Sequence, residues 1–101
     1  MKVYGVIGYP LTHSFSKKYF TEKFQREGIK DCIYEVYPIR SIYELKDLIK
    51  QNPGLHGLNI TIPYKQLVFS HLDTTKNIPE GLNACNCIKI KDGKIVGYNT
   101  D

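Results

Sequence analysis

The chain has 101 residues, of which 42% are hydrophobic and 24% charged, proportions that are ordinary for a single globular domain. Its formal net charge is +4, but the basic residues are spread along the chain and do not form the clustered stripe typical of nucleic-acid-binding proteins. No apolar stretch is long enough to span a membrane, and no secretory leader pattern precedes the first strand-like segment, so we expect a cytoplasmic location.

The first third of the chain alternates between strand-like and helix-like patterns. Residues 3–7 are a short apolar run that ends at Gly8-Tyr9-Pro10, which predicts a strand followed by a loop. Residues 14–26 carry aromatic side chains at helical spacing and are followed by Gly28, which predicts an amphipathic helix with a C-terminal glycine. Residues 32–36 predict a second strand.

The middle of the chain repeats this alternation. Ser41 and Glu44 form a capping box, in which each side chain satisfies a free backbone amide at the start of a helix. Apolar residues at helical spacing follow, and Asn52-Pro53-Gly54 ends the helix. Residues 55–62 predict a third strand, and Pro63 favours a short helix over residues 63–69 because proline suits a first helical turn.

A change of pattern marks the end of the chain. Residues 73–81 are polar and rich in turn residues, which predicts a loop. Residues 85–91 and 94–98 flank Asp92-Gly93, the dipeptide most typical of a two-residue β-hairpin turn. Together the elements predict one α/β domain over residues 1–101, with three α/β/α layers, a mostly parallel mixed sheet, and one antiparallel strand in the C-terminal hairpin.

The cysteines and histidines do not indicate a disulfide framework or a metal site. Cys32, Cys85 and Cys87 are an odd number of cysteines in a chain with ample core-forming residues, which favours reduced thiols. The three histidines stand at no ligand spacing relative to the cysteines, so we expect no bound metal.

Polar clusters occur where the predicted strands end, and ligands of open α/β sheets bind outside the carboxyl ends of the strands. Ser14 and Ser16 begin a helix, where hydroxyls and free amides can bind a carboxylate or phosphate, or simply cap the helix. Lys65 lies near another helix start, where the helix dipole disfavours its positive charge. It is a candidate general acid or base, or an ordinary surface lysine.

Four further polar residues are candidates for the same site. Asn59 and Thr61 are two apart in a predicted strand and so project from the same face. Asn86 stands in apolar sequence and is either a ligand contact or a structural tie to a loop. Asp101 could orient the ammonium group of Lys65 in a proton-transfer pair, or could be a turn or helix-cap residue.

The order and spacing of these clusters resemble the substrate domain of the shikimate dehydrogenase family over nearly the whole chain. Residues 8–16 (GYPLTHSFS) look like the N-terminal signature of that family. Residues 57–65 (GLNITIPYK) match its most specific motif, and residues 97–101 (GYNTD) match the junction before the cofactor domain.

The resemblance implies roles in the reversible, NADP-dependent reduction of 3-dehydroshikimate to shikimate, on the route to chorismate and the aromatic amino acids. Ser14 and Ser16 are expected to hold the shikimate carboxylate. Lys65, paired with Asp101, is expected to handle the proton during hydride transfer. The ring hydroxyls are expected to contact Asn59, Thr61, Asn86 and Asp101.

The resemblance also implies that NADP binds mainly outside this chain, because no Gly-x-Gly-x-x-Gly turn of a Rossmann domain occurs in it. We therefore expect the isolated chain to bind substrate without turnover. Two alternatives remain open: a quinate/shikimate dehydrogenase, and a non-catalytic small-molecule-binding domain. The expected partner is the small-molecule substrate, not nucleic acid or membrane, and a homodimer is compatible with the sequence.

Overall fold

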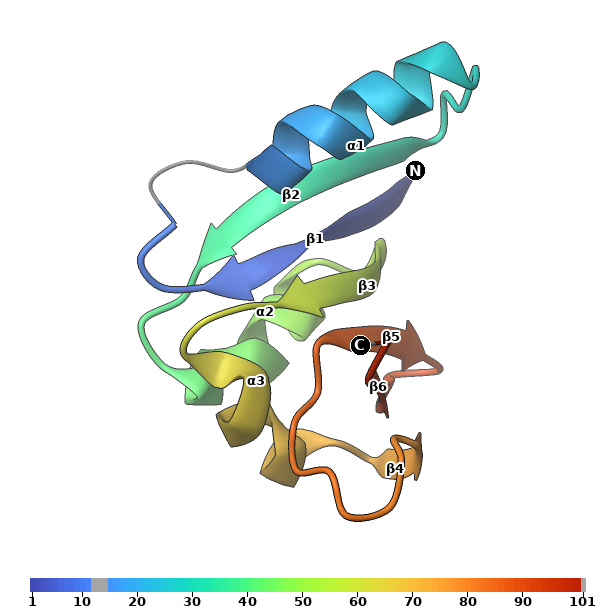
Figure 1. Ribbon diagram of the computed structural model, residues 1–101. Helices are drawn as coiled ribbons and strands as arrows, with labels where there is room; N and C mark the ends of the chain where they lie inside the picture. Colours follow the sequence, from blue (N-terminus) through green and yellow to red (C-terminus); the bar gives the residue numbers. More distant parts are fainter. Residues whose placement is uncertain (12–14, 101) are drawn as a thin grey trace.

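A six-stranded sheet forms the centre of the molecule in the computed structural model, which describes residues 1–11 and 15–100 (Figure 1). The strand order across the sheet is β2-β1-β3-β5-β6-β4. β5 runs antiparallel to both of its neighbours, and the other pairs are parallel, which confirms the mostly parallel mixed sheet. The strands are β1 (Lys2–Gly8), β2 (Cys32–Pro38), β3 (Leu55–Ile60), β4 (Thr74–Asn77), β5 (Cys87–Lys91) and β6 (Lys94–Tyr98).

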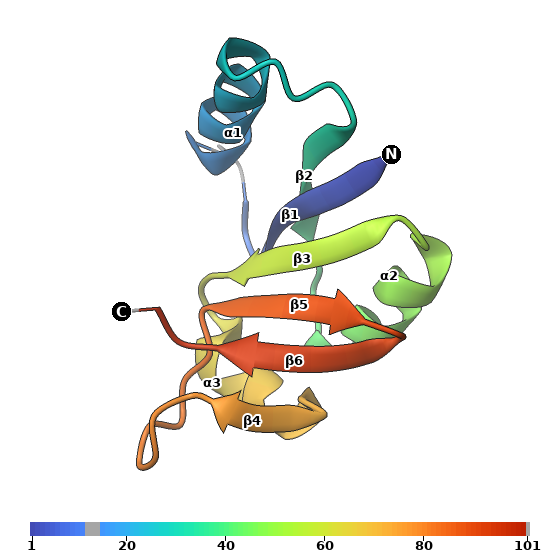
Figure 2. The same cartoon turned by 90° about the vertical axis from the view of Figure 1, so that its right-hand side faces the viewer.

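Helices lie on both faces of the sheet, so the predicted three layers are present. Helix α1 (Phe15–Arg26) packs on one face beside β2, whereas α2 (Leu45–Gln51) and α3 (Tyr64–Leu67) lie on the other face (Figures 1 and 2). Short 3₁₀ helices, Ile42–Glu44 and Val68–His71, precede α2 and follow α3. No helix in the described part of the chain is long and apolar enough to cross a membrane.

The hydrophobic core lies between the sheet and the layer of α2 and α3. Ile7, Leu58 and Ile88 come from three adjacent strands, and their side chains are at most 2% exposed. Leu45 and Val68 pack against them from the helical side and are fully buried. Burial of each such side chain stabilises the fold by about 1.5–3 kcal/mol, so this face of the sheet holds the strand ends in place.

Three local sequence signals are confirmed. The amide of Ser41 donates to the Glu44 carboxylate at 2.9 Å while Ser41 Oγ accepts from the amide of Tyr43, which completes a capping box. Gly28 ends α1 with φ of 69°, a left-handed conformation that suits glycine. Asp92 and Gly93 both have positive φ between β5 and β6, as a two-residue hairpin turn requires.

The structure differs from the sequence expectation in the bounds of several strands. β1 is one residue longer at each end than expected, and β2 extends to Pro38 instead of residue 36. The third strand ends at Ile60 instead of residue 62, and the first hairpin strand begins at Cys87 instead of residue 85. The expectation of a continuous loop over residues 73–81 is wrong, because Thr74–Asn77 form β4 at the edge of the sheet. This strand is short and mostly exposed, and it pairs only with β6, so it lacks the apolar alternation that reveals a strand in sequence.

Candidate functional site

The carboxyl ends of β1, β3 and β6 meet at one edge of the sheet, and the antiparallel β5 begins at that edge. The backbone connects these ends directly. The amide of Ile60 donates to Asn86 O at 2.9 Å, and the amide of Asn86 donates to Tyr98 O at 3.1 Å. Asn59, Thr61 and Asn86, which the sequence predicted as site residues, therefore lie along one polar edge.

Asn59 is half-buried near the end of β3, where it pairs with Cys87 of β5. Its carboxamide nitrogen donates to the hydroxyl oxygen of Tyr34 at 2.8 Å. Tyr34 belongs to β2, so this hydrogen bond crosses β1, which lies between β2 and β3 in the sheet. With the nitrogen engaged in this way, the carboxamide oxygen of Asn59 is the end that is turned away from Tyr34.

Thr61 directly follows β3 and is held close to the end of β1. Its amide donates to Ile7 O at 3.0 Å, and its carbonyl accepts from the amide of Tyr64 at 3.0 Å. A Cβ atom on Gly8 would lie only 2.5 Å from the Thr61 methyl group, so the two segments can approach this closely because residue 8 is glycine. The turn after β3 thereby brings Thr61 against the first loop of the site.

Asn86 connects the start of β5 to the segment that follows β6. Its carboxamide nitrogen donates to Thr100 Oγ1 at 2.9 Å, and its oxygen accepts from the amide of Thr100 at 3.1 Å. The neighbouring Asn99 donates from its side chain to Ala84 O at 3.0 Å. Asn86 is therefore a structural tie to this loop. One amide hydrogen and one oxygen lone pair remain as capacity for a ligand contact.

Lys65 is exposed in the first turn of α3, and its backbone is anchored on both sides. Its carbonyl accepts from the amide of Cys85 at 2.8 Å, one residue before Asn86. The preceding Tyr64 is 3% exposed, and its hydroxyl donates to Ile39 O at 2.5 Å, which attaches α3 to the segment after β2. The Lys65 side chain therefore leaves a fixed backbone next to the Asn86 segment.

The remaining predicted site residues fall partly or wholly outside the described part of the chain. Ser14 and Asp101 lie outside the described residues. Ser16 lies in the first turn of α1, and only its backbone is described. Thr100, which Asn86 holds by two hydrogen bonds, is the immediate neighbour of Asp101 in the chain.

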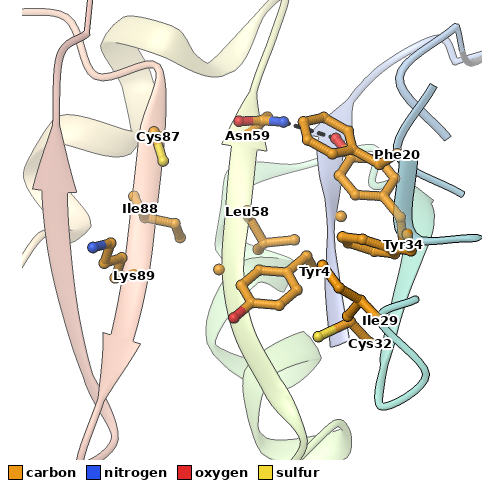
Figure 3. A pocket seen from close by; sticks show the side chains of 13 residues that line it. Tyr4, Phe20, Ile29, Cys32, Tyr34, Leu58, Asn59, Cys87, Ile88 and Lys89 are labelled. Carbon is orange, nitrogen blue, oxygen red and sulfur yellow. Dashed lines mark hydrogen bonds between the residues drawn. The ribbon is translucent and has the colours of Figure 1, made fainter. Parts of the chain in front are cut away.

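A cavity of about 380 Å³ lies on the face of the sheet that carries α1 (Figure 3). Its lining is largely apolar and aromatic, with contributions from Tyr4, Phe20, Phe24, Ile29, Tyr34 and Ile88. Among the described residues of the predicted site, Asn59 alone also lines this cavity. The polar edge, and not the apolar cavity, is therefore the candidate site for a hydroxylated ligand.

The thiols at this edge are structural in character. The Cys85 thiol is fully buried, and this burial raises its pKa. The pKa of Cys87 is also raised, mainly by burial and to a smaller extent by the charge of Cys85 when ionised. Both groups therefore stay protonated at neutral pH and are poor nucleophiles or metal ligands. All three cysteines are free, and residues 1–11 and 15–100 contain no cluster of three potential metal ligands among His, Cys, Asp and Glu.

Two residues of the site were not singled out from the sequence. Tyr34 holds Asn59, and Thr100 binds both ends of the Asn86 carboxamide. Tyr34 and Asn59 are 25 residues apart, and only the strand order reveals that they meet. Asn86 and Thr100 are 14 residues apart and flank the β5–β6 hairpin, whose register brings them together.

Fold and site together define an α/β domain that presents polar side chains for a small molecule at the carboxyl edge of its sheet. Over residues 6–88 the chain matches the family described as shikimate dehydrogenase substrate binding domain. The chain belongs to this family.

Individual relatives and solved structures agree with the family match. The chain is 37% identical over 103 residues to the NADP(+) shikimate dehydrogenase of Clostridium perfringens strain SM101, covering 100% of this chain and 37% of that protein. It superposes on shikimate dehydrogenase 1 of Peptoclostridium difficile with a TM-score of 0.84 and 30% identity, covering 99% of this chain and 38% of the other.

A shikimate 5-dehydrogenase of Thermus thermophilus, solved in complex with shikimate, gives a TM-score of 0.81 at 25% identity, with coverage of 99% and 38%. The chain thus spans little more than a third of the length of the relatives that it matches.

Proposed function

We propose that this chain is the shikimate-binding part of an NADP-dependent shikimate dehydrogenase, which reversibly reduces 3-dehydroshikimate to shikimate in the cytoplasm. One observation carries the proposal. The Lys65 carbonyl and the Thr100 side chain are both hydrogen-bonded to the consecutive residues Cys85 and Asn86. The lysine and the residue next to Asp101 are thereby attached to the same short segment, beside Asn59 and Thr61.

Each proposed role follows from the chemistry of the side chain. The hydroxyls of Ser14 and Ser16 are proposed to bind the carboxylate of shikimate, because hydroxyl and amide donors near a helix N-terminus suit an anion. The carboxamide oxygen of Asn59 and the hydroxyl of Thr61 can accept hydrogen bonds from ring hydroxyls. Asn86 is proposed to contact the ring through the amide hydrogen and the oxygen lone pair that Thr100 does not use.

Proton handling is assigned to Lys65 and Asp101. In the oxidation of shikimate, a proton must leave the hydroxyl that becomes the ketone, and the amine of Lys65 is proposed to accept it. A carboxylate at residue 101 would orient the resulting ammonium group and stabilise its charge. In the reverse direction the same ammonium group would return the proton to the new alcohol.

The residues of this chain do not themselves fit a dinucleotide. β1 ends at Gly8 and is followed by Tyr9-Pro10, and the sequence lacks the glycine-rich turn with which a Rossmann domain binds a pyrophosphate at a helix N-terminus. We therefore assign NADP to a separate domain of the polypeptide, and the roles proposed here for residues 14–101 are substrate binding and proton transfer.

The test is a spectrophotometric assay of the full-length polypeptide that carries this chain. We expect shikimate-dependent reduction of NADP, with slower reduction of NAD and little oxidation of quinate. Efficient quinate oxidation with NAD would instead favour a quinate/shikimate dehydrogenase. Shikimate binding without cofactor reduction would favour a non-catalytic binding domain, which a coding sequence lacking a glycine-rich β-α-β unit after Asp101 would independently support.

A further inference from the structure

Asn59 has a dedicated hydrogen-bond partner on a different strand. Its carboxamide nitrogen donates to the Tyr34 hydroxyl oxygen at 2.8 Å, the contact drawn as a dashed line in Figure 3. An asparagine side chain presents a donor end and an acceptor end, and either end can face a ligand when the amide rotates. Engagement of the nitrogen therefore determines which end of Asn59 faces away from Tyr34.

Tyr34 is itself held firmly. Its side chain is 3% exposed, and its ring stacks on Phe20 of α1 with a centroid separation of 4.8 Å and an interplanar angle of 16°. A tyrosine has only two side-chain torsions before its hydroxyl, and burial between a strand and a helix restricts both of them. The hydroxyl is thus a fixed reference point on the α1 face of the sheet.

We propose that Tyr34 is a positioning residue that holds the Asn59 carboxamide with its oxygen available to a ring hydroxyl of the substrate. This assignment rests on the proposed function, because it concerns how the same site recognises shikimate. The hydroxyl of Tyr34 acts through Asn59 and does not need to touch the substrate. Without it the amide can rotate, and the donor end then faces the ring hydroxyl for part of the time.

The variant that tests the proposal is Tyr34→Phe in the full-length polypeptide, because it removes only the hydroxyl and keeps the ring that stacks on Phe20. Loss of one orienting hydrogen bond should raise the KM for shikimate about 3- to 10-fold and change kcat much less. Tyr43→Phe is the matched control, since Tyr43 is 80% exposed on the far side of the core, and this change should leave KM as it is.

A double-mutant cycle separates positioning from general packing. In an Asn59→Ala background, Tyr34→Phe should add no further increase in KM, because the side chain through which Tyr34 acts is gone. A merely structural role would instead give the same increase in both backgrounds. Thermal unfolding of each variant shows whether stability changes in parallel with KM.

The outcomes distinguish the two proposals. An unchanged KM in Tyr34→Phe, or an equal increase in the Asn59→Ala background, overturns the role of Tyr34 while leaving the dehydrogenase assignment intact. If the unsubstituted polypeptide neither binds shikimate nor oxidises it, the proposed function is wrong, and the role of Tyr34 in substrate recognition is wrong with it.

Discussion

At the scale of single residues, two amide side chains are oriented by partners from other elements. Asn59 is held by Tyr34 of β2, and Asn86 is held at both ends by Thr100 beyond β6. Lys65 differs from both, because its side chain is exposed while its backbone is fixed through Cys85. These arrangements support the roles proposed above, recognition of hydroxyl groups for the two amides and proton transfer for the lysine.

We expect Lys65→Ala to lower kcat of the full-length polypeptide by about 10²- to 10⁴-fold, because it removes the group assigned to proton transfer. The KM for shikimate should change by no more than about three-fold, because the recognising side chains remain. Steady-state kinetics with shikimate and NADP measure both constants. Lys94→Ala, at an exposed lysine in the hairpin, is the matched control, and an unaltered kcat in Lys65→Ala would exclude this role.

At the scale of elements, the turns before and after the helices decide where polar side chains emerge. The 3₁₀ helix Ile42–Glu44 and α2 begin at a capping box, and Ile42 and Leu45 of this region enter the core. The core holds β3, and the turn after β3 presents Thr61 and Lys65. Stability of the α2 layer is therefore a precondition for the geometry of the polar edge.

Ser41→Ala should lower the free energy of unfolding by about 0.5–2 kcal/mol, because the hydroxyl that accepts from the Tyr43 amide is lost. Urea denaturation of the chain followed by circular dichroism measures the change. Ser41→Thr retains a hydroxyl at the same position and should recover most of the lost stability. Equal losses in the two variants would show that the hydrogen bond is not the cause.

At the scale of the whole molecule, the two faces of the sheet are covered unequally. Helices α2 and α3 close one face over a continuous core, while in the described part of the chain α1 is the helix that covers the other face, beside β2 (Figure 2). The apolar cavity lies on this second face. Several titratable groups are nevertheless desolvated, and their protonation is linked to the stability of the entire domain.

Stability should fall as the pH rises above about 8.5, where thiols in an unfolded chain begin to ionise. Burial raises the pKa of Cys85, so the folded state keeps its proton longer than the unfolded state does. The unfolded state is therefore favoured at alkaline pH, and the stabilising contribution is fully present only below the unfolded-state pKa. Burial also raises the pKa of Tyr64, so the loss of stability continues above about pH 10, where tyrosines in an unfolded chain ionise.

Free energies of unfolding measured under reducing conditions between about pH 7 and 10 test this linkage. The free energy of unfolding of Cys85→Ala should decline less steeply with pH than that of the unsubstituted chain. The substitution also lowers stability at neutral pH, because it leaves a small cavity. Parallel declines in the two proteins would show that Cys85 does not contribute to the alkaline loss.

Local sequence determined the helix start, the helix end and the hairpin turn, because each depends on residues that are close together in the chain. The capping box at Ser41, the left-handed Gly28 and the Asp92-Gly93 turn each depend on a few consecutive residues, and all three are present. The alternation of strand and helix patterns likewise predicted the α/β class and the single antiparallel strand. The motifs at residues 57–65 and 97–101 indicated the family to which the chain belongs.

Other features were decided only by the tertiary structure. β4 is a strand because β6 offers it a partner, although its own residues are polar. Asn59 binds Tyr34 because β2 and β3, which are separated by α2 in the chain, lie on either side of β1 in the sheet. The physical reason is that a hydrogen bond between side chains depends on position in space, and the order of strands is set by burial of the whole core and not by any local pattern.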